Sequence, residues 1–228
     1  MKFLKNLILA ALLFPMVAFA ASPARQEYLD AMAAKPDEVH GRELFEHCAT
    51  CHGPAADGTT EGATPRIAGQ HFRVLVQQLI DFRYGKRWDF RMEGVATDLH
   101  ILTEAQDIAD VASFVSHLDR GGARGIGDGT QVERGAALYV SKCVSCHGIN
   151  GEGDGQKGIP RIGGQHAGYL MRQIYDAVDG RRPPLSETHR KRFARLDFDD
   201  VRGLSDFLAR AGWEGSPPHA PPYDTPDK

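Results

Sequence analysis

Apolar residues recur at helical spacing along this chain of 228 residues, and the same pattern occurs twice. Ile108, Val111 and Val115 fall three and four positions apart, which is typical of the buried face of a helix. Val201 and Leu208 repeat the pattern further along, and the alternation typical of strands is nearly absent. The pattern therefore predicts an all-α protein. The predicted helices span about 38–47, 71–84 and 103–119 in the first half, and about 131–142, 166–179 and 197–210 in the second.

A block of seven residues indicates an internal repeat. Pro65–His71 recurs 95 residues later as Pro160–His166, and six of the seven residues are identical. Five glycines between 121 and 130 disfavour a regular helix or strand, so this segment is the expected linker. The repeat therefore predicts two tandem domains. The expected divisions are a first domain at 21–120, the linker at 121–130, a second domain at 131–211 and a proline-rich tail at 212–228.

Residues 1–20 have the features of a signal peptide for export. Lys2 and Lys5 precede an apolar run, and Ala18 and Ala20 fit a small-residue cleavage site. The run is shorter than the roughly 20 apolar residues that a membrane-spanning helix needs. We therefore expect cleavage after Ala20, with membrane attachment only through a partner or an uncleaved signal.

All four cysteines belong to two copies of a Cys-x-x-Cys-His motif. In this motif two thiols can add to the two vinyl groups of one porphyrin, while the adjacent histidine reaches the iron. The sequence thus predicts two covalently bound haem c groups. The expected attachment points are Cys48, Cys51, Cys143 and Cys146, and the expected proximal ligands are His52 and His147. Zinc is an alternative for Cys-x-x-Cys but gives no reason for the histidine. A redox dithiol or a disulfide framework is a further alternative in an oxidising compartment.

With these motifs in place, the mature chain resembles the two-domain dihaem class I cytochromes c of the c-four type. The resemblance also rests on the Pro-Arg-Ile-x-Gly-Gln-His blocks and on a glycine and an aromatic residue before each haem motif. These are Gly41 and Phe45 in the first half and Gly135 and Tyr139 in the second. The resemblance implies two tandem class I cytochrome c domains, each all-α and wrapped around one haem. It also implies that the first and last helices of each domain cross, with Phe45 packed on Phe114. Tyr139 is expected to pack on Phe207 in the same way.

The resemblance further implies the surroundings of each proximal histidine. Pro65 and Pro160 each follow a haem histidine by 13 residues, at about the place where the family's proline offers its carbonyl to the imidazole. Such a bond fixes the ring orientation and raises the basicity of the ligand. Arg66 and Arg161 resemble residues that approach a haem propionate, with an arginine that faces solvent as the alternative.

A low-spin electron-transfer haem needs a second axial ligand, which in this family is a methionine in the loop before the last helix. Met92 stands 40 residues after His52 in a segment that looks like this loop. The resemblance therefore assigns His52 and Met92 to the first iron, with His100 as a weaker alternative. His71 and His166 come too soon after the haem motifs to match the loop and are expected to be structural.

The second half departs from the family pattern, because the corresponding segment 183–193 contains no methionine. Met171 falls within a predicted helix and is expected in the core. His189 stands 42 residues after His147, close to the spacing of 40 in the first half. We therefore predict His147 and His189 as the ligands of the second iron; a solvent-exposed histidine and a five-coordinate iron are the alternatives. Methionine ligation raises a haem potential relative to bis-histidine ligation, so electrons are expected to pass from the second haem to the first.

The charge of the chain argues against nucleic acid as a partner. Without the signal peptide, 25 basic and 30 acidic residues give a net charge of −5, whereas nucleic acid is normally bound through a basic face. Residues 21–120 carry 10 basic and 16 acidic side chains (net −6), and residues 121–228 carry 15 and 14 (net +1). This asymmetry favours entry of electrons from an acidic donor at the second half, although an ordinary solvated surface is the alternative. The basic residues expected to meet the donor are Arg181, Arg182, Arg190, Lys191, Arg192 and Arg195.

The resemblance implies a periplasmic carrier of single electrons rather than an enzyme. The expected donor is a dehydrogenase or a quinol-oxidising complex, and the expected acceptor is an oxidase or a reductase. Contact with a membrane is expected only through such partners. One alternative is a haem enzyme that binds peroxide or a sulfur oxyanion at an open or labile second haem. Another is a haem subunit of a larger dehydrogenase, with the proline-rich tail as an interface.

Overall fold

The structure is a computed structural model and describes residues 21–182 and 187–212. Within these ranges the regular structure is helical, and one isolated β-bridge joins Asp154 to Ile159. The all-α fold class is thus confirmed. The predicted signal peptide and all but the first residue of the predicted tail lie outside the described residues. The helices are α1 (Pro23–Ala33), α2 (Glu38–His52), α3 (Phe72–Arg83), α4 (Phe90–Thr97), α5 (Ala105–His117), α6 (Val132–Lys142), α7 (Val144–His147), α8 (Ala167–Val178), α9 (Glu187–Phe193) and α10 (Phe198–Arg210).

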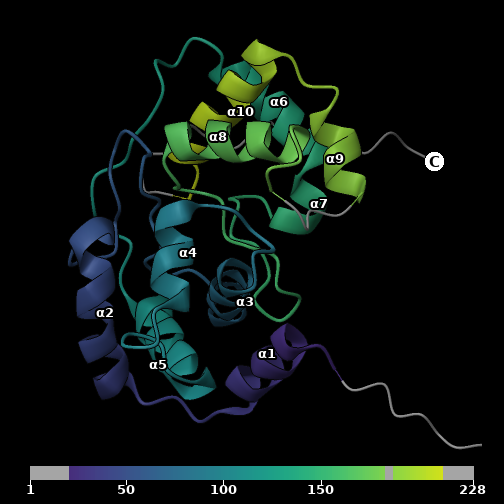
Figure 1. Ribbon diagram of the computed structural model, residues 1–228. Coiled ribbons are helices and arrows are strands. Elements are labelled where there is room, and N and C mark those ends of the chain that lie inside the picture. Colours follow the sequence, from purple (N-terminus) through teal and green to yellow (C-terminus); the bar gives the residue numbers. More distant parts are fainter. Residues whose placement is uncertain (1–20, 183–186, 213–228) are drawn as a thin grey trace, which may run out of the picture.

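The helices form two bodies in chain order, with α1 to α5 in the first and α6 to α10 in the second (Figure 1). In each body the helix that leads to the haem motif crosses the last helix, α2 on α5 and α6 on α10. The crossings are very close. A Cβ atom at Gly41 would lie 2.2 Å from the carbonyl oxygen of Asp110, and one at Gly135 would lie 2.0 Å from that of Gly203. Glycine is therefore required at both crossings, because any side chain would meet the backbone of the opposite helix.

An aromatic pair supports each helix crossing. The ring centroids of Phe45 and Phe114 are 5.5 Å apart, and those of Tyr139 and Phe207 are 5.4 Å apart. Both distances fall in the usual range for packed aromatic rings, so the two expected contacts are confirmed. No helix in the described part of the chain has the length and apolar character needed to span a membrane.

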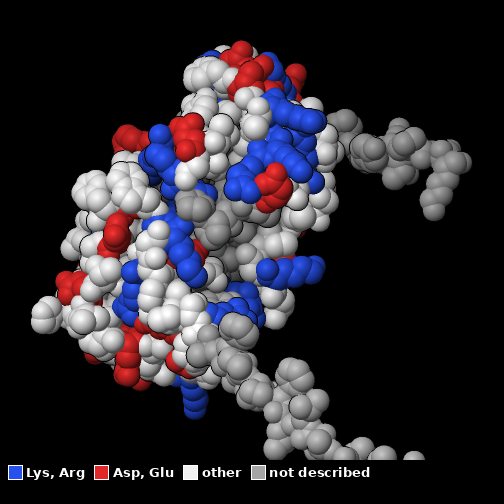
Figure 2. All heavy atoms as spheres, turned by 45° about the vertical axis from the view of Figure 1, so that its right-hand side comes forward, with Lys and Arg blue, Asp and Glu red and all other residues white. Residues whose placement is uncertain are grey.

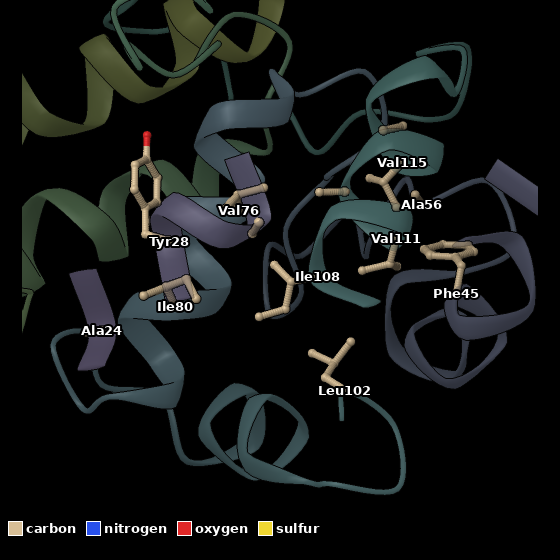
Figure 3. Packing of buried hydrophobic residues seen from close by; sticks show 13 residues of the cluster. Ala24, Tyr28, Phe45, Ala56, Val76, Ile80, Leu102, Ile108, Val111 and Val115 are labelled. Atoms are coloured by element: carbon tan, nitrogen blue, oxygen red, sulfur yellow. The ribbon is translucent and has the colours of Figure 1, made fainter. Parts of the chain in front are cut away.

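Among the described residues, the first body has the larger hydrophobic core. Its cluster, shown in Figure 3, contains 13 buried residues, against six in the cluster of the second body. Helix α1 contributes Ala24, Tyr28 and Ala31 to this cluster, and the Tyr28 hydroxyl accepts a hydrogen bond from Arg73 at 2.7 Å. The sequence pattern did not predict α1, because two of its three buried residues are alanines and give little apolar periodicity.

The helix that carries the haem motif differs between the two bodies. Helix α2 runs unbroken through the first motif, whereas the helical path breaks at Cys143, between α6 and α7. Phe45 precedes Cys48 by three positions, but Tyr139 precedes Cys143 by four. The aromatic residue is fixed by its contact with the last helix. In an unbroken helix, one extra residue between it and the first cysteine would rotate the haem motif about the helix axis by about 100°. The break between α6 and α7 compensates for this rotation. The Tyr139 hydroxyl bridges the break, because it donates to the carbonyl oxygen of Gly148, after α7, at 2.5 Å.

An ion pair at the first helix crossing contains a histidine where the second crossing has an arginine. His40 Nδ1 lies 2.9 Å from Asp110 Oδ2 and 3.9 Å from Asp107 Oδ1. The hydrogen bond with Asp110 raises the pKa of His40 above its ordinary value of 6.5, although burial opposes the change. In the second body Arg134 lies 2.6 Å from Asp200 and keeps its charge at any ordinary pH.

We expect the stability of the protein to depend on pH through His40. Because the folded pKa is raised, the stabilisation is complete below the unfolded pKa of about 6.5 and is lost as the pH rises through the higher folded pKa. The free energy of unfolding of the haem-loaded protein, measured with denaturant on both sides of this window, should fall more steeply with pH in the wild type than in His40→Gln. Arg134→Gln should lower stability equally at both pH values. Equal pH slopes in the wild type and His40→Gln would contradict the prediction.

Candidate haem sites

His52 lies at the end of α2, is buried, and has its ring oriented by a backbone carbonyl. Its Nδ1 lies 3.0 Å from the carbonyl oxygen of Pro65, so Nδ1 carries the donated proton and Nε2 is left for a metal. Burial lowers the pKa of His52, while the Pro65 carbonyl partly opposes the change. The neutral imidazole is the form that coordinates metals. Cys48 is half-buried and Cys51 is exposed in the same helix.

The second motif repeats this geometry on α7. Nδ1 of the buried His147 lies 3.1 Å from the carbonyl oxygen of Pro160. Burial lowers the pKa of His147, and the charge of Arg192 lowers it further. Cys143 is half-buried and Cys146 is exposed. No disulfide joins any of the four cysteines, so the structure gives no support to a disulfide framework.

Helix α4 carries Met92 in the first body. The Asp89 side chain caps this helix by accepting hydrogen bonds from the backbone N–H groups of Arg91, at 3.1 Å, and Met92, at 3.4 Å. The charges of Arg91 and Asp89 both act on the pKa of His52, in opposite directions, so the start of α4 lies near the proximal histidine. Met92 is half-buried, whereas His100 is exposed. The local structure therefore fits Met92 better than His100 as the second ligand.

Helix α9 carries His189 in the second body. Its ring centroid is 6.1 Å from that of His147, with the ring planes at 73°. Two opposed imidazoles bound to one metal ion at ~2.0–2.1 Å per bond place their centroids about 6 Å apart, so the pair fits an intervening metal. Burial, followed by the charge of His147, lowers the pKa of His189 and favours its neutral form. Met171 packs against the second hydrophobic core, as expected.

The two bodies meet through the two copies of the repeated block. Gln70 donates from Nε2 to the carbonyl oxygen of Arg161 at 2.8 Å, and its Oε1 accepts from the backbone N–H of Arg161 at 2.9 Å. Gln165 makes the same two bonds to Arg66, at 2.7 and 2.9 Å. We call these four reciprocal hydrogen bonds the glutamine clasp. The clasp gives the recurrence of the block a physical reason, because each copy binds the backbone of the other.

The two histidines of the repeated block extend this contact. His71 Nε2 lies 2.7 Å from the carbonyl oxygen of Glu152, and His166 Nε2 lies 2.6 Å from that of Asp57. Each histidine thus binds the backbone of the opposite body, which agrees with the structural role expected for both. Sequence reasoning did not identify the contact between the bodies, although identical polar side chains at a fixed offset are the pattern that a two-fold contact would produce.

Arg66 lies at this boundary and is buried. Its guanidinium pairs with Asp57 at 3.0 Å and donates to the carbonyl oxygens of Gly164 at 2.7 Å, Gly122 at 2.9 Å and Ala123 at 2.8 Å. The alternative of a solvent-facing Arg66 is therefore wrong. The side chain ties its own body to the linker and to the second body, which explains why it is an arginine with several fixed donors.

Arg161, the counterpart of Arg66, has a different environment. Its Nε atom is buried and has no hydrogen-bond partner among the residues that the structure describes. A buried donor of a charged group without an acceptor is costly, so the site fits an anionic group such as a haem propionate. Burial, followed by the charges of Arg161 and Arg66, lowers the pKa of the neighbouring Arg120 to about 9. The boundary thus has an excess of positive charge on this side.

The geometry agrees with the comparison to known protein families. A model of the cytochrome c family matches residues 39–119 and 132–211, which together cover more than half of the chain. The chain belongs to the cytochrome c family. Cytochrome c4 from Pseudomonas aeruginosa is 31% identical over 186 residues, which cover 77% of this chain and 89% of that protein. The crystal structure of reduced recombinant cytochrome c4 from Pseudomonas stutzeri matches with a TM-score of 0.69 and 27% identity, over 78% of this chain and 100% of that one.

Part of a thiosulfate dehydrogenase is similar in structure to this chain. The structure of thiosulfate dehydrogenase from Marichromatium purpuratum matches with a TM-score of 0.68 and 27% identity, over 77% of this chain and 40% of that one.

Two cytochrome c domains, each with its Cys-x-x-Cys-His motif, hold two covalently bound haem c groups. The chain is a dihaem cytochrome of the c4 type and an electron carrier. Membership of the cytochrome c family excludes the zinc alternative.

Proposed function

We propose that this cytochrome carries single electrons in the periplasm through two haems with different axial ligands. In this proposal His52 and Met92 bind the first iron, and His147 and His189 bind the second. The observation that carries it is the pair of imidazole rings of His147 and His189, whose centroids lie 6.1 Å apart, about the separation of two imidazoles bound to one metal ion. The predicted signal peptide supports export.

The residues around each motif have defined tasks in this function. The cysteines attach the haems, which exchange one electron each when bound. The carbonyl groups of Pro65 and Pro160 hold the proximal rings with Nε2 directed away from the backbone and make the imidazoles more basic. Arg161, with its unpartnered Nε atom, is suited to bind a propionate. The donors of Arg66 described above contact the linker and the second body instead.

The ligand difference gives the electron path a direction. Methionine raises the potential of the first haem relative to a bis-histidine second haem, so electrons enter at the second body and leave from the first. Basic side chains gather on the second body (Figure 2), where Arg190, Lys191 and Arg195 are exposed. We propose this face as the docking site of an acidic donor. Arg182, which is half-buried, and Arg192, which donates to the carbonyl oxygen of Lys142, contribute less to it than expected.

The proposed donor is a dehydrogenase or a quinol-oxidising complex, and the proposed acceptor is an oxidase or a reductase. One relative favours a narrower donor. The thiosulfate dehydrogenase electron acceptor of Stutzerimonas stutzeri is 28% identical over 171 residues, which cover 72% of this chain and 79% of that protein. A dehydrogenase that oxidises a sulfur oxyanion is therefore the second candidate donor, and it requires no catalysis by this chain.

Spectroscopy of the purified protein tests the ligand assignment. We expect two low-spin haems in the electron paramagnetic resonance spectrum, one with His/Met and one with His/His character. Met92→Ala should convert only the first to high spin, because its iron loses one axial ligand, and His189→Ala should convert only the second. A high-spin haem in the wild type that His189→Ala leaves unchanged would contradict the assignment of His189 to the second iron. It would favour an enzyme with an open second iron.

A further inference from the structure

Two arginines at equivalent positions of the repeat, Arg87 and Arg182, lie together where the two bodies meet. They stand 95 residues apart, the offset of the repeated block. Gln173 Oε1 accepts a hydrogen bond from each of them, at 2.7 Å from Arg87 Nη2 and 2.6 Å from Arg182 Nη1. Two guanidinium groups from different bodies therefore converge on one carboxamide oxygen.

These two charges have no carboxylate in ion-pairing range among the described residues. The nearby acids are engaged elsewhere: Asp176 pairs with Arg181 at 2.9 Å, and Asp81 accepts from the side chain of Gln77 at 2.8 Å. Arg87 is only 9% exposed, and burial, followed by the charge of Arg87, lowers the pKa of Arg182 to about 10. Like charges that are partly desolvated and close together are unfavourable unless an anion joins them.

Neutral polar groups orient the two cations without neutralising them. The Tyr169 hydroxyl accepts from Arg87 Nη2 at 2.6 Å, and Gln78 Oε1 accepts from the other terminal nitrogen, Nη1. Burial acts to raise the pKa of Tyr169, but the charges of Arg87 and Arg182 outweigh it and lower the pKa. Fixed guanidinium groups of this kind suit the planar geometry of a carboxylate.

Open space lies beside the arginines. Four residues that stand within two positions of Arg87 or Arg182 line a hollow of about 350 Å³ between the two bodies: Gly85, Trp88, Gly180 and Arg181. A Cβ atom at Gly85 or Gly180 would meet no atom within 4 Å. The segments that carry the two arginines therefore leave room for an anion beside them.

We propose that Arg87 and Arg182 form one shared anion site that binds a propionate carboxylate from each haem, so that each arginine acts on both haems. The proposal rests on the two-haem electron-carrier function. The covalently bound haems supply carboxylates in every copy of the protein, two per haem, so Arg161 can bind a different propionate. Arg87 stands five residues before Met92, and Arg182 stands seven before His189, so each arginine leads into the proposed ligand segment of its own body. Through Tyr169 and Gln173, Arg87 also reaches into the opposite body.

Redox titration of the haem-loaded protein tests the shared site. Removal of one positive charge near both irons stabilises the ferric states, so both midpoint potentials should fall in Arg87→Gln and again in Arg182→Gln. We expect at least a threefold change in the ratio of oxidised to reduced haem at fixed potential, which is about 28 mV at 59 mV per tenfold. Arg181→Gln is the matched control, because it removes the same charge from an exposed side chain at the same hollow. Arg87→Lys and Arg182→Lys keep the charge and should change the potentials less than the glutamine variants.

Each other outcome overturns part of the proposal. Shifts no larger than those of Arg181→Gln would exclude the anion site. A shift confined to the haem of the altered body would exclude sharing. A wild-type potential that depends on added chloride or phosphate, with the dependence lost in the glutamine variants, would identify a free anion instead of a propionate. If one glutamine variant does not fold, the other carries the test from the opposite body. Electron paramagnetic resonance reports the axial ligands separately, so failure of the ligand assignment is distinguishable from failure of the shared anion site.

Discussion

Replacing His189 by methionine is expected to raise the midpoint potential of the second haem toward that of the first. The reason is that a thioether ligand favours the ferrous state relative to a second imidazole. We expect a change on the order of 0.1 V, a modest part of the ~0.8 V that axial ligands can span. With nearly equal potentials, the electron would lose its preferred direction between the haems. Spectroelectrochemical titration of the wild type and His189→Met measures both midpoints.

The reverse substitution supplies the control for this prediction. Met92→His should lower the potential of the first haem and leave the potential of the second haem unchanged, since His147 and His189 belong to the other body. Equal midpoints in the wild type would count against directional transfer, and a second midpoint that His189→Met leaves unchanged would show that His189 is not an axial ligand. The basic face of α9 would then have to be explained by docking alone.

Replacement of Gly135 by alanine should destabilise the second body strongly. The new Cβ atom would lie 2.0 Å from the carbonyl oxygen of Gly203 and 2.7 Å from the backbone nitrogen of Leu204. Backbone atoms on a packed helix cannot move aside as a flexible side chain can. Overpacking costs about 1–3 kcal/mol, and occasionally more, and we expect the upper end here. Denaturant unfolding followed by circular dichroism gives the change in free energy.

Gly94→Ala is the matched control, because Gly94 also lies within a helix but a Cβ atom there would meet nothing within 4 Å. Alanine should stabilise α4 by about 0.5–1 kcal/mol relative to glycine. Gly41→Ala should behave like Gly135→Ala, since its Cβ atom would lie 2.2 Å from the carbonyl oxygen of Asp110. If Gly135→Ala were as stable as the wild type, α6 and α10 could not cross as closely as described.

The last helix of each body could be predicted from the sequence because its apolar face is long and regular. The predicted helix at 103–119 corresponds to α5, and the one at 197–210 corresponds to α10. Helices α4 and α9 were missed because each has eight residues or fewer and buries at most one side chain. Such short helices depend on their surroundings rather than on their own apolar pattern.

The candidate site was predictable to a similar extent. The haem motifs and the prolines are close in sequence, so fixed spacing was enough to relate His52 to Pro65 and His147 to Pro160. The environment of Arg66 was not predictable, since its partners come from the linker and from the opposite body. Contacts between residues 56 to 98 positions apart leave no local pattern.

The glutamine clasp also constrains how the two halves can diverge. Loss of Gln70 would leave both the backbone N–H and the carbonyl oxygen of Arg161 without their partners, and loss of Gln165 would do the same to Arg66. A substitution in one block therefore damages the other body as well as its own. The proposed ligand segments are not linked in this reciprocal way, because each provides a ligand only to the iron of its own body. After a duplication, the ligand of one haem can change while the blocks that join the halves stay alike.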